Sequence, residues 1–225
     1  MALNVRGGRD VSCRFLPGQG GRPPAKQRSV TVKPERSHVS RPPVERLPTG
    51  GRTLQIESLI RAIPDFPIPG ILFRDITPLL KDKDGFKATV DLFVKRYEQT
   101  EIDFVVAIEA RGYMLGAPLA YKLGAGFVPV RKPGKLPGAK FTEEYALEYG
   151  TNSLEIHEDA IGHGQRVLVI DDLLATGGTA SATARLLERL GANIVGFAFL
   201  VELTFLDGRS TLEGLGHEVT SFVRY

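Results

Sequence analysis

The stretch RVLVIDDLLATGGT, residues 166–179, decides the fold expected for this 225-residue chain. Its apolar run Val167–Ile170 is typical of a strand that is buried on both faces. Asp171 and Asp172 follow as adjacent carboxylates, and we expect the strand to end there. A small glycine-containing turn comes next, and apolar residues then recur with helical spacing. The stretch therefore predicts a strand, a turn and a helix in succession.

The turn between this strand and this helix predicts an anion-binding site. Backbone N–H groups and the positive end of the helix dipole point at a ligand in such a turn. No lysine follows the second glycine, so the turn differs from the Walker phosphate-binding pattern. The predicted phosphate-binding residues are Ala175, Thr176, Gly177, Gly178 and Thr179.

The two carboxylates beside the turn favour a ribose phosphate as the ligand. Acids next to a phosphate site repel the phosphate, so the ligand must carry groups that compensate for the repulsion. Ionised Asp171 and Asp172 would accept hydrogen bonds from the 2′- and 3′-hydroxyls of a ribose. The simpler alternative is a strand-to-helix turn with solvated acids, but the whole combination favours a receptor for ribose 5-phosphate.

Composition excludes several classes of protein and site. The single Cys13 rules out an intramolecular disulfide and a cysteine-built metal site, and none of the 4 histidines forms a pair with ligand spacing. No apolar run approaches the length that spans a bilayer. The net charge of +3 is unevenly distributed: residues 1–50 carry +7 and the remainder carries −4. The basic balance therefore gives no argument that the body of the protein binds nucleic acid.

Residues 1–52 are predicted to be a disordered basic extension, followed by one domain over residues 53–225. Residues 1–50 contain 7 of the 15 prolines and no sustained periodicity. Four interpretations remain open: a dispensable tail, an upstream start codon, an organelle-targeting peptide or a nucleic-acid-binding arm. We favour the first two together, because no amphipathic helix and no secretory apolar core is evident.

Strands that alternate with helices along residues 53–225 predict an α/β fold with a mainly parallel sheet. Ligands of such sheets bind beyond the carboxyl ends of the strands. One further strand end is Glu109-Ala110-Arg111, where Arg111 and the backbone could hold a diphosphate. Another carries Arg131, Lys132 and Lys135 at the start of a long polar loop over residues 132–145. This loop could close over a leaving diphosphate as a mobile lid, although solvated cations are the ordinary alternative.

Two more positions suggest a site for a nucleobase. Glu148, beside Tyr149, could manage the proton of a purine, or could be an exposed acid. A base could stack on Phe73 beside Arg74, with Leu203 closing the other side. Core packing of Phe73 and an ion pair between Arg74 and Asp75 is the alternative that residue types alone favour.

These motifs, in this order, resemble the type I phosphoribosyltransferase family, which uses 5-phosphoribosyl-1-diphosphate (PRPP). The similarity covers roughly residues 54–225. Its strongest stretches are residues 65–78, Arg111-Gly112, residues 131–137, residues 147–156 and the stretch 166–179. The resemblance is closest to the adenine-specific branch. Relatives that act on 6-oxopurines carry an acid where this chain has Ala175.

The resemblance implies a fold, a reaction and roles for the residues above. The fold would be a mainly parallel sheet flanked by helices, with a flexible lid loop and a small hood. The reaction would join adenine to PRPP and release AMP and diphosphate, in purine salvage. The resemblance also implies a non-proline cis peptide at or next to Glu109–Ala110. The implied roles are ribose binding by Asp171 and Asp172, phosphate binding by residues 175–179, diphosphate binding by Glu109, Ala110, Arg111, Arg131, Lys132 and Lys135, adenine binding by Phe73, Arg74 and Leu203, and catalysis by Glu148, Tyr149 and Arg111.

The resemblance further implies Mg²⁺ held mainly through PRPP and water, a homodimer, a cytoplasmic location, and no nucleic-acid or membrane partner. Two other functions remain open. The enzyme could use another base, such as orotate or guanine. A PRPP-sensing regulator on the same fold is a different class, but it needs a DNA-binding module, and residues 1–50 are too irregular to form one.

Overall fold

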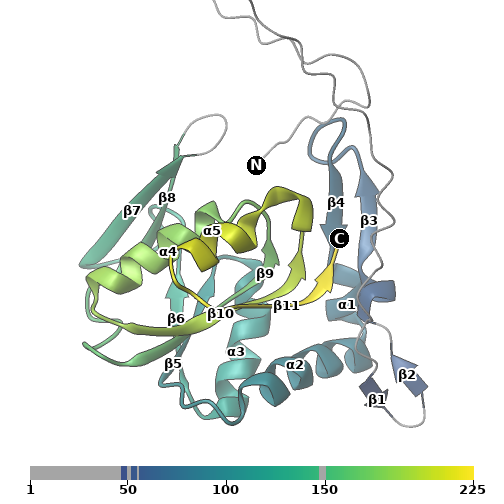
Figure 1. The fold of residues 1–225 in the computed structure, drawn as a ribbon, viewed down its shortest axis with the longest axis horizontal. Helices are drawn as coiled ribbons and strands as arrows, with labels where there is room; N and C mark the ends of the chain where they lie inside the picture. The colour runs from purple at the N-terminus through teal and green to yellow at the C-terminus, as the bar shows by residue number, and fades with distance from the viewer. Residues whose placement is uncertain (1–46, 50–51, 55, 147–150) are drawn as a thin grey trace, which may run out of the picture.

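The computed structural model describes residues 47–49, 52–54, 56–146 and 151–225 (Figure 1). The predictions for residues 1–46, and for Glu148 and Tyr149, therefore lie outside the described residues. A short antiparallel pair, β1 (Leu47–Thr49) with β2 (Arg52–Leu54), straddles the predicted domain boundary.

The centre of the molecule is a five-stranded sheet in the order β11-β10-β9-β5-β6. Every neighbouring pair in it is parallel, which confirms the predicted α/β architecture. Parallel neighbours need crossover connections, and helices supply three of the four that this sheet order requires. The strands and these helices are β5 (Phe104–Ile108), α3 (Arg111–Leu123), β6 (Gly126–Val130), β9 (Arg166–Leu174), α4 (Gly178–Arg189), β10 (Asn193–Glu202), α5 (Gly208–Gly214) and β11 (Val219–Arg224).

The sheet is buried on both faces because successive strand residues point to opposite sides. In β9, Val167 and Val169 join one core cluster, while Leu168 and Ile170 join the other. Helices α4 and α5 cover the first face, and α2 (Lys83–Tyr97) and α3 cover the second (Figure 1). The remaining elements are η1 (Ile56–Leu59), β3 (Arg61–Pro64), β4 (Leu72–Asp75), α1 (Thr77–Lys81), β7 (Lys140–Ala146), β8 (Thr151–His157) and η2 (Thr204–Leu206).

Two antiparallel pairs stand at opposite ends of the sheet (Figure 1). The pair β3–β4 lies on the β11 side, and its turn contains a cis peptide at Phe66–Pro67. The pair β7–β8 lies on the β6 side. The strand ends that carry the predicted site residues lie between these two pairs (Figure 1).

Two expected boundaries were wrong. The loop predicted over residues 132–145 ends at residue 139, because Lys140–Ala146 pairs with β8 along its whole length. The strand predicted to end before Asp171 continues to Leu174, because Leu173 and Leu174 pair with Val201 and Glu202 of β10. Asp171 and Asp172 are therefore strand residues, whose side chains point in opposite directions.

Candidate active site

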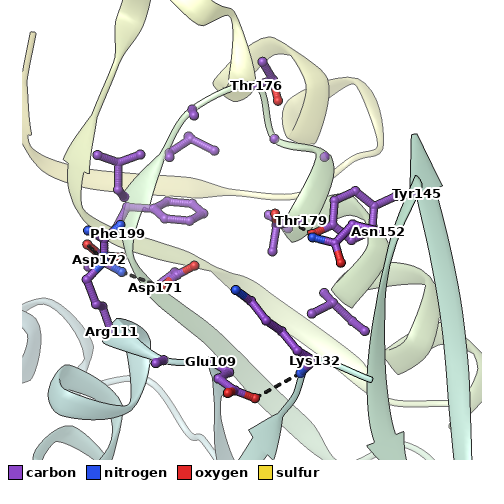
Figure 2. Close-up of a pocket in the computed structure, with 18 residues that line it drawn as sticks. Glu109, Arg111, Lys132, Tyr145, Asn152, Asp171, Asp172, Thr176, Thr179 and Phe199 are labelled. Carbon is purple, nitrogen blue, oxygen red and sulfur yellow. Dashed lines mark hydrogen bonds and ion pairs between the residues drawn. The ribbon is translucent and has the colours of Figure 1, made fainter. Parts of the chain in front are cut away.

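A cavity of about 300 Å³ lies at the carboxyl ends of β5 and β9, between the start of α4 and the β7–β8 pair (Figure 2). Most residues predicted to bind PRPP line it. They are Glu109, Ala110, Arg111, Lys132, Asp171, Asp172, Ala175, Thr176, Gly177, Gly178 and Thr179. The structure thus brings three predicted strand ends together in one site.

The two acids of β9 have different surroundings. Asp171 points into the cavity, and its Oδ1 accepts a hydrogen bond from the Asp172 amide at 2.8 Å (Figure 2). Asp172 is only 3% exposed, and its Oδ2 forms an ion pair with Nε of Arg111 at 2.9 Å. The angle at this contact does not meet hydrogen-bond geometry, so Oδ2 has no hydrogen-bond partner among the described residues. Burial raises the pKa of Asp171 well above the ordinary carboxyl value, and the Asp172 charge adds to this rise. Burial also raises the pKa of Asp172, although the Arg111 charge opposes it.

This arrangement suits a ligand that donates hydrogen bonds. Without such donors, the half-buried Asp171 and the buried Asp172 resist ionisation together, as their raised pKa values indicate. A diol that donates to the carboxylates would favour their charged forms. Helix α3 approaches β9 closely at Gly112, where a Cβ would lie 2.9 Å from Asp171 Oδ1. The absence of a side chain at Gly112 therefore leaves room for the Asp171 carboxylate.

The turn after β9 leaves the N-terminus of α4 open toward the cavity. Its N-cap residue is Gly177, with φ of 83°, which carries no side chain to cap the helix. The first backbone N–H groups of a helix have no acceptor within the helix, so they are available to an anion. Thr179 Oγ1 donates to the Tyr145 hydroxyl at 3.3 Å, which places a phenol over the same helix start (Figure 2). The helix start therefore has the geometry of an anion-binding site, and phosphate binding there stays a prediction.

The end of β5 is tied to the following polar loop. The peptide between Glu109 and Ala110 is cis, as predicted. Glu109 Oε2 accepts hydrogen bonds from the Lys132 amide at 3.0 Å and from Nε of Arg131 at 3.2 Å. Burial tends to raise the pKa of Glu109, but these donors outweigh it and hold the pKa below its ordinary value. Glu109 therefore fixes the loop backbone beside the cavity.

Of the three predicted loop cations, only Lys132 lines the cavity. Arg131 Nη1 donates to the Lys135 carbonyl at 3.0 Å, which turns this guanidinium toward its own loop. The loop is also held by Glu155, which is 5% exposed and accepts from the Gly134 amide at 3.2 Å. The described conformation thus leaves Arg131 and Lys135 outside the cavity lining.

The predicted adenine-binding residues also lie outside this lining. The Arg111 guanidinium lies 5.2 Å from the centre of the Phe73 ring, so Phe73 adjoins the site through Arg111. Arg74 stacks on the Tyr225 ring at 3.5 Å, and Asp75 pairs with Arg61 rather than with Arg74. Leu203 follows β10 beside the end of β9, where its amide donates to the Leu174 carbonyl at 2.9 Å.

Sequence reasoning missed several residues that line the cavity: Tyr145, Asn152, Leu154, Leu173, Leu174, Ala180 and Phe199. Tyr145 and Asn152 are cross-strand partners in the β7–β8 pair, so they share one face of it. They also flank the segment that carries the predicted catalytic residues Glu148 and Tyr149. The β-branched and aromatic residues Phe141, Thr142 and Tyr145 were a weak strand signal that could have suggested this pair.

Within residues 47–49, 52–54, 56–146 and 151–225, no cluster of three or more His, Cys, Asp or Glu side chains could hold a metal ion. In the same part of the chain, no helix combines the length and apolar character needed to cross a bilayer.

Comparisons with known proteins agree with this geometry. The family model of the phosphoribosyl transferase domain matches residues 76–219. Adenine phosphoribosyltransferase of Desulfitobacterium hafniense is 57% identical over 174 residues, which cover 77% of this chain and 99% of the relative. The adenine phosphoribosyltransferase of Acaryochloris marina is 63% identical over 159 residues, which cover 71% of this chain and 94% of the relative.

Solved structures show the same relationship. The adenine phosphoribosyltransferase of Thermoanaerobacter pseudethanolicus shares 55% identity and a TM-score of 0.73, over 76% of this chain and 98% of that one. The Saccharomyces cerevisiae enzyme, solved with adenine and an imino-altritol bisphosphate, is 40% identical and superimposes with a TM-score of 0.70. The match covers 74% of this chain and 96% of that one. The chain belongs to the phosphoribosyltransferase family and, within it, to the adenine phosphoribosyltransferases.

Proposed function

We propose that this chain transfers the 5-phosphoribosyl group of PRPP to adenine and forms AMP and diphosphate, as an enzyme of purine salvage. The observation that carries the proposal is the pair Asp171 and Asp172 placed directly before the uncapped N-terminus of α4. The close relatives named adenine phosphoribosyltransferase support it, and so does the small residue Ala175 in the turn.

In this proposal the ribose phosphate binds along the end of β9 and the start of α4. Asp171 and Asp172 accept hydrogen bonds from the ribose hydroxyls, and these donors favour the charged carboxylates whose pKa values the unliganded site raises. Backbone N–H groups of the turn at residues 175–179 bind the 5′-phosphate, together with the Thr179 hydroxyl. The ribose is thereby oriented with its anomeric carbon toward the middle of the cavity.

Arg111 and Lys132 are proposed to stabilise the departing diphosphate. Glu109 and Ala110 present the backbone at the end of β5, and the loop cations Arg131 and Lys135 join when the loop closes over the site. Mg²⁺ would be held mainly by PRPP oxygens and water, with Asp171 as the nearby carboxylate. When bound, the ion neutralises negative charge on the diphosphate.

Adenine is proposed to stack on Phe73, with Leu203 on its other side and Arg74 helping to seat it. The Arg111 guanidinium, between the Phe73 ring and Asp172, supports a base site that adjoins the ribose site. During transfer, a bond forms between adenine N9 and the anomeric carbon, while the bond from that carbon to the diphosphate oxygen breaks. The N9 proton passes to Glu148, and Tyr149 closes the site.

We further propose a cytoplasmic homodimer. The support for a dimer is an exposed apolar surface on α3 and β6, where Met114, Tyr121 and Phe127 are 47%, 84% and 37% exposed. Either subunit could supply the loop cations. Equilibrium ultracentrifugation of the full chain tests the oligomeric state.

The test of the function is an AMP-formation assay on the purified full chain with PRPP, Mg²⁺ and a panel of adenine, guanine and orotate. We expect AMP from adenine, and little product from guanine or orotate. Faster turnover of another base would overturn the proposed specificity. Glu148→Ala is expected to abolish most turnover, and an unchanged rate would remove the proposed role of Glu148.

A further inference from the structure

Gly208, the first residue of α5, lies against the turn that follows β9. This glycine is buried, and a Cβ built on it would lie 2.1 Å from the Ala175 carbonyl oxygen and 3.0 Å from the Gly177 amide nitrogen. A Cβ on Gly177 would in turn lie 3.0 Å from the Gly208 carbonyl oxygen. The backbones of α5 and of the turn therefore touch directly, where any side chain would separate them.

The backbone conformation of Gly208 does not itself require glycine. Its φ lies outside the left-handed region, and helical positions favour alanine over glycine. A Cβ on Gly214, at the other end of the same helix, would meet no atom of the described residues within 4 Å. Gly208 thus differs from Gly214 in being buried against the turn, and this contact accounts for glycine at position 208.

Helix α5 cannot readily move away from the turn, because its second residue is locked to the sheet. Arg209 donates from Nε and Nη2 to the two carboxylate oxygens of Glu202, at 3.0 and 2.7 Å, and from Nη1 to the Val219 carbonyl at 2.7 Å. Glu202 is 4% exposed, and Leu212 anchors the next turn of α5 in the core. A side chain at position 208 would therefore displace the turn rather than the helix.

We propose that Gly208 is a positioning residue that sets the shape of the phosphate-binding turn and, through it, the affinity for the 5′-phosphate of PRPP. This inference rests on the proposed function of the turn. Relief of the contact with Ala175 requires a shift of about 1 Å, and misplacement on this scale can cost on the order of 100-fold. Adenine binding should be spared, because its proposed residues lie on other elements.

The experiment compares Gly208→Ala with the matched control Gly214→Ala, both in the full chain, by steady-state kinetics. For Gly208→Ala we expect a KM for PRPP raised at least about tenfold, and a KM for adenine within about twofold of the wild type. Gly214→Ala should match the wild type. An unchanged KM for PRPP in folded Gly208→Ala would overturn the inference, and so would equal rises in both KM values together with a lower Tm.

Calorimetric titration with ribose 5-phosphate separates this inference from the proposed reaction. Weaker binding by Gly208→Ala than by Gly214→Ala supports the inference even if the wild type forms no AMP, whereas equal binding overturns it. If Gly208→Ala does not fold, Arg209→Lys replaces it. The lysine would keep one ion pair with Glu202 in place of the three hydrogen bonds from Arg209 to Glu202 and Val219, so α5 would be held less firmly. A KM for PRPP raised about two- to fivefold is then expected, because the substitution loosens the contact between α5 and the turn without removing a ligand contact, and an unchanged value overturns the inference.

Discussion

The proposed ribose-phosphate half of the site and the proposed base half are built in different ways. The first half consists of neighbours in the sequence, at the end of β9 and the start of α4, and it lines one cavity. The second half combines Phe73 and Arg74 of the β3–β4 pair with Leu203 after β10, and these side chains contact Arg111, Tyr225 and the core. Local structure fixes the first half, whereas the second depends on how distant segments pack. Substitutions in the two halves should therefore affect different substrates and differ in size.

The largest effect is expected for Asp171→Asn, in the ribose-phosphate half. Hydrogen bonds to charged groups contribute about 1.5–3 kcal/mol each, so kcat/KM for PRPP should fall about 100-fold. Steady-state kinetics measures this, with Asp91→Asn on α2 as the control. A loss below about threefold would show that Asp171 does not hold the ribose.

The same substitution should stabilise the unliganded protein. Burial raises the pKa of Asp171 in the folded state, so folding disfavours its charged form. The free energy of unfolding therefore falls as the pH rises from the ordinary carboxyl pKa of about 4 through the raised pKa of Asp171. At neutral pH, Asp171→Asn removes this penalty, and we expect a Tm higher by about 2–4 °C. A lower Tm in calorimetry would contradict the inferred direction.

A smaller effect, on adenine rather than on PRPP, is expected for Phe73→Ala in the proposed base half. Stacking of a base on an aromatic ring contributes about 1–3 kcal/mol, so the KM for adenine should rise about tenfold or more. The KM for PRPP should stay within about twofold, since the ribose and phosphate contacts remain. Phe73→Tyr is the control that keeps the ring. Equal rises in both KM values would remove the distinction between the halves.

The smallest effect is expected for Tyr145→Phe, which removes only the hydroxyl that Thr179 contacts at 3.3 Å. A neutral hydrogen bond contributes about 0.5–1.5 kcal/mol, so the KM for PRPP should rise about threefold. Tyr121→Phe is the matched control, because Tyr121 is 84% exposed on α3. Kinetics with PRPP varied at saturating adenine checks the result. A shift in the adenine KM alone would assign Tyr145 to the base half.

Much of the ribose-phosphate half was predictable. The run Val167–Ile170, the two carboxylates and the glycine turn each have a local physical meaning, and the structure confirms their order. The end of the strand was misplaced because adjacent polar residues suggested a terminus, whereas pairing with β10 carries β9 on to Leu174. Tyr145 was missed because the polar composition of its segment resembles a loop, until pairing with β8 makes it a strand.

The amino-acid sequence by itself determined the α/β architecture and the chemistry of the turn proposed to bind phosphate. Both follow from interactions within a few residues, namely apolar periodicity, glycine conformations and the open end of a helix. Only the tertiary structure decided that Glu109 holds the Lys132 amide, that Arg74 stacks on Tyr225 and that Gly208 touches Ala175. These contacts join residues far apart along the chain, and no local sequence pattern predicts which distant segment packs beside them.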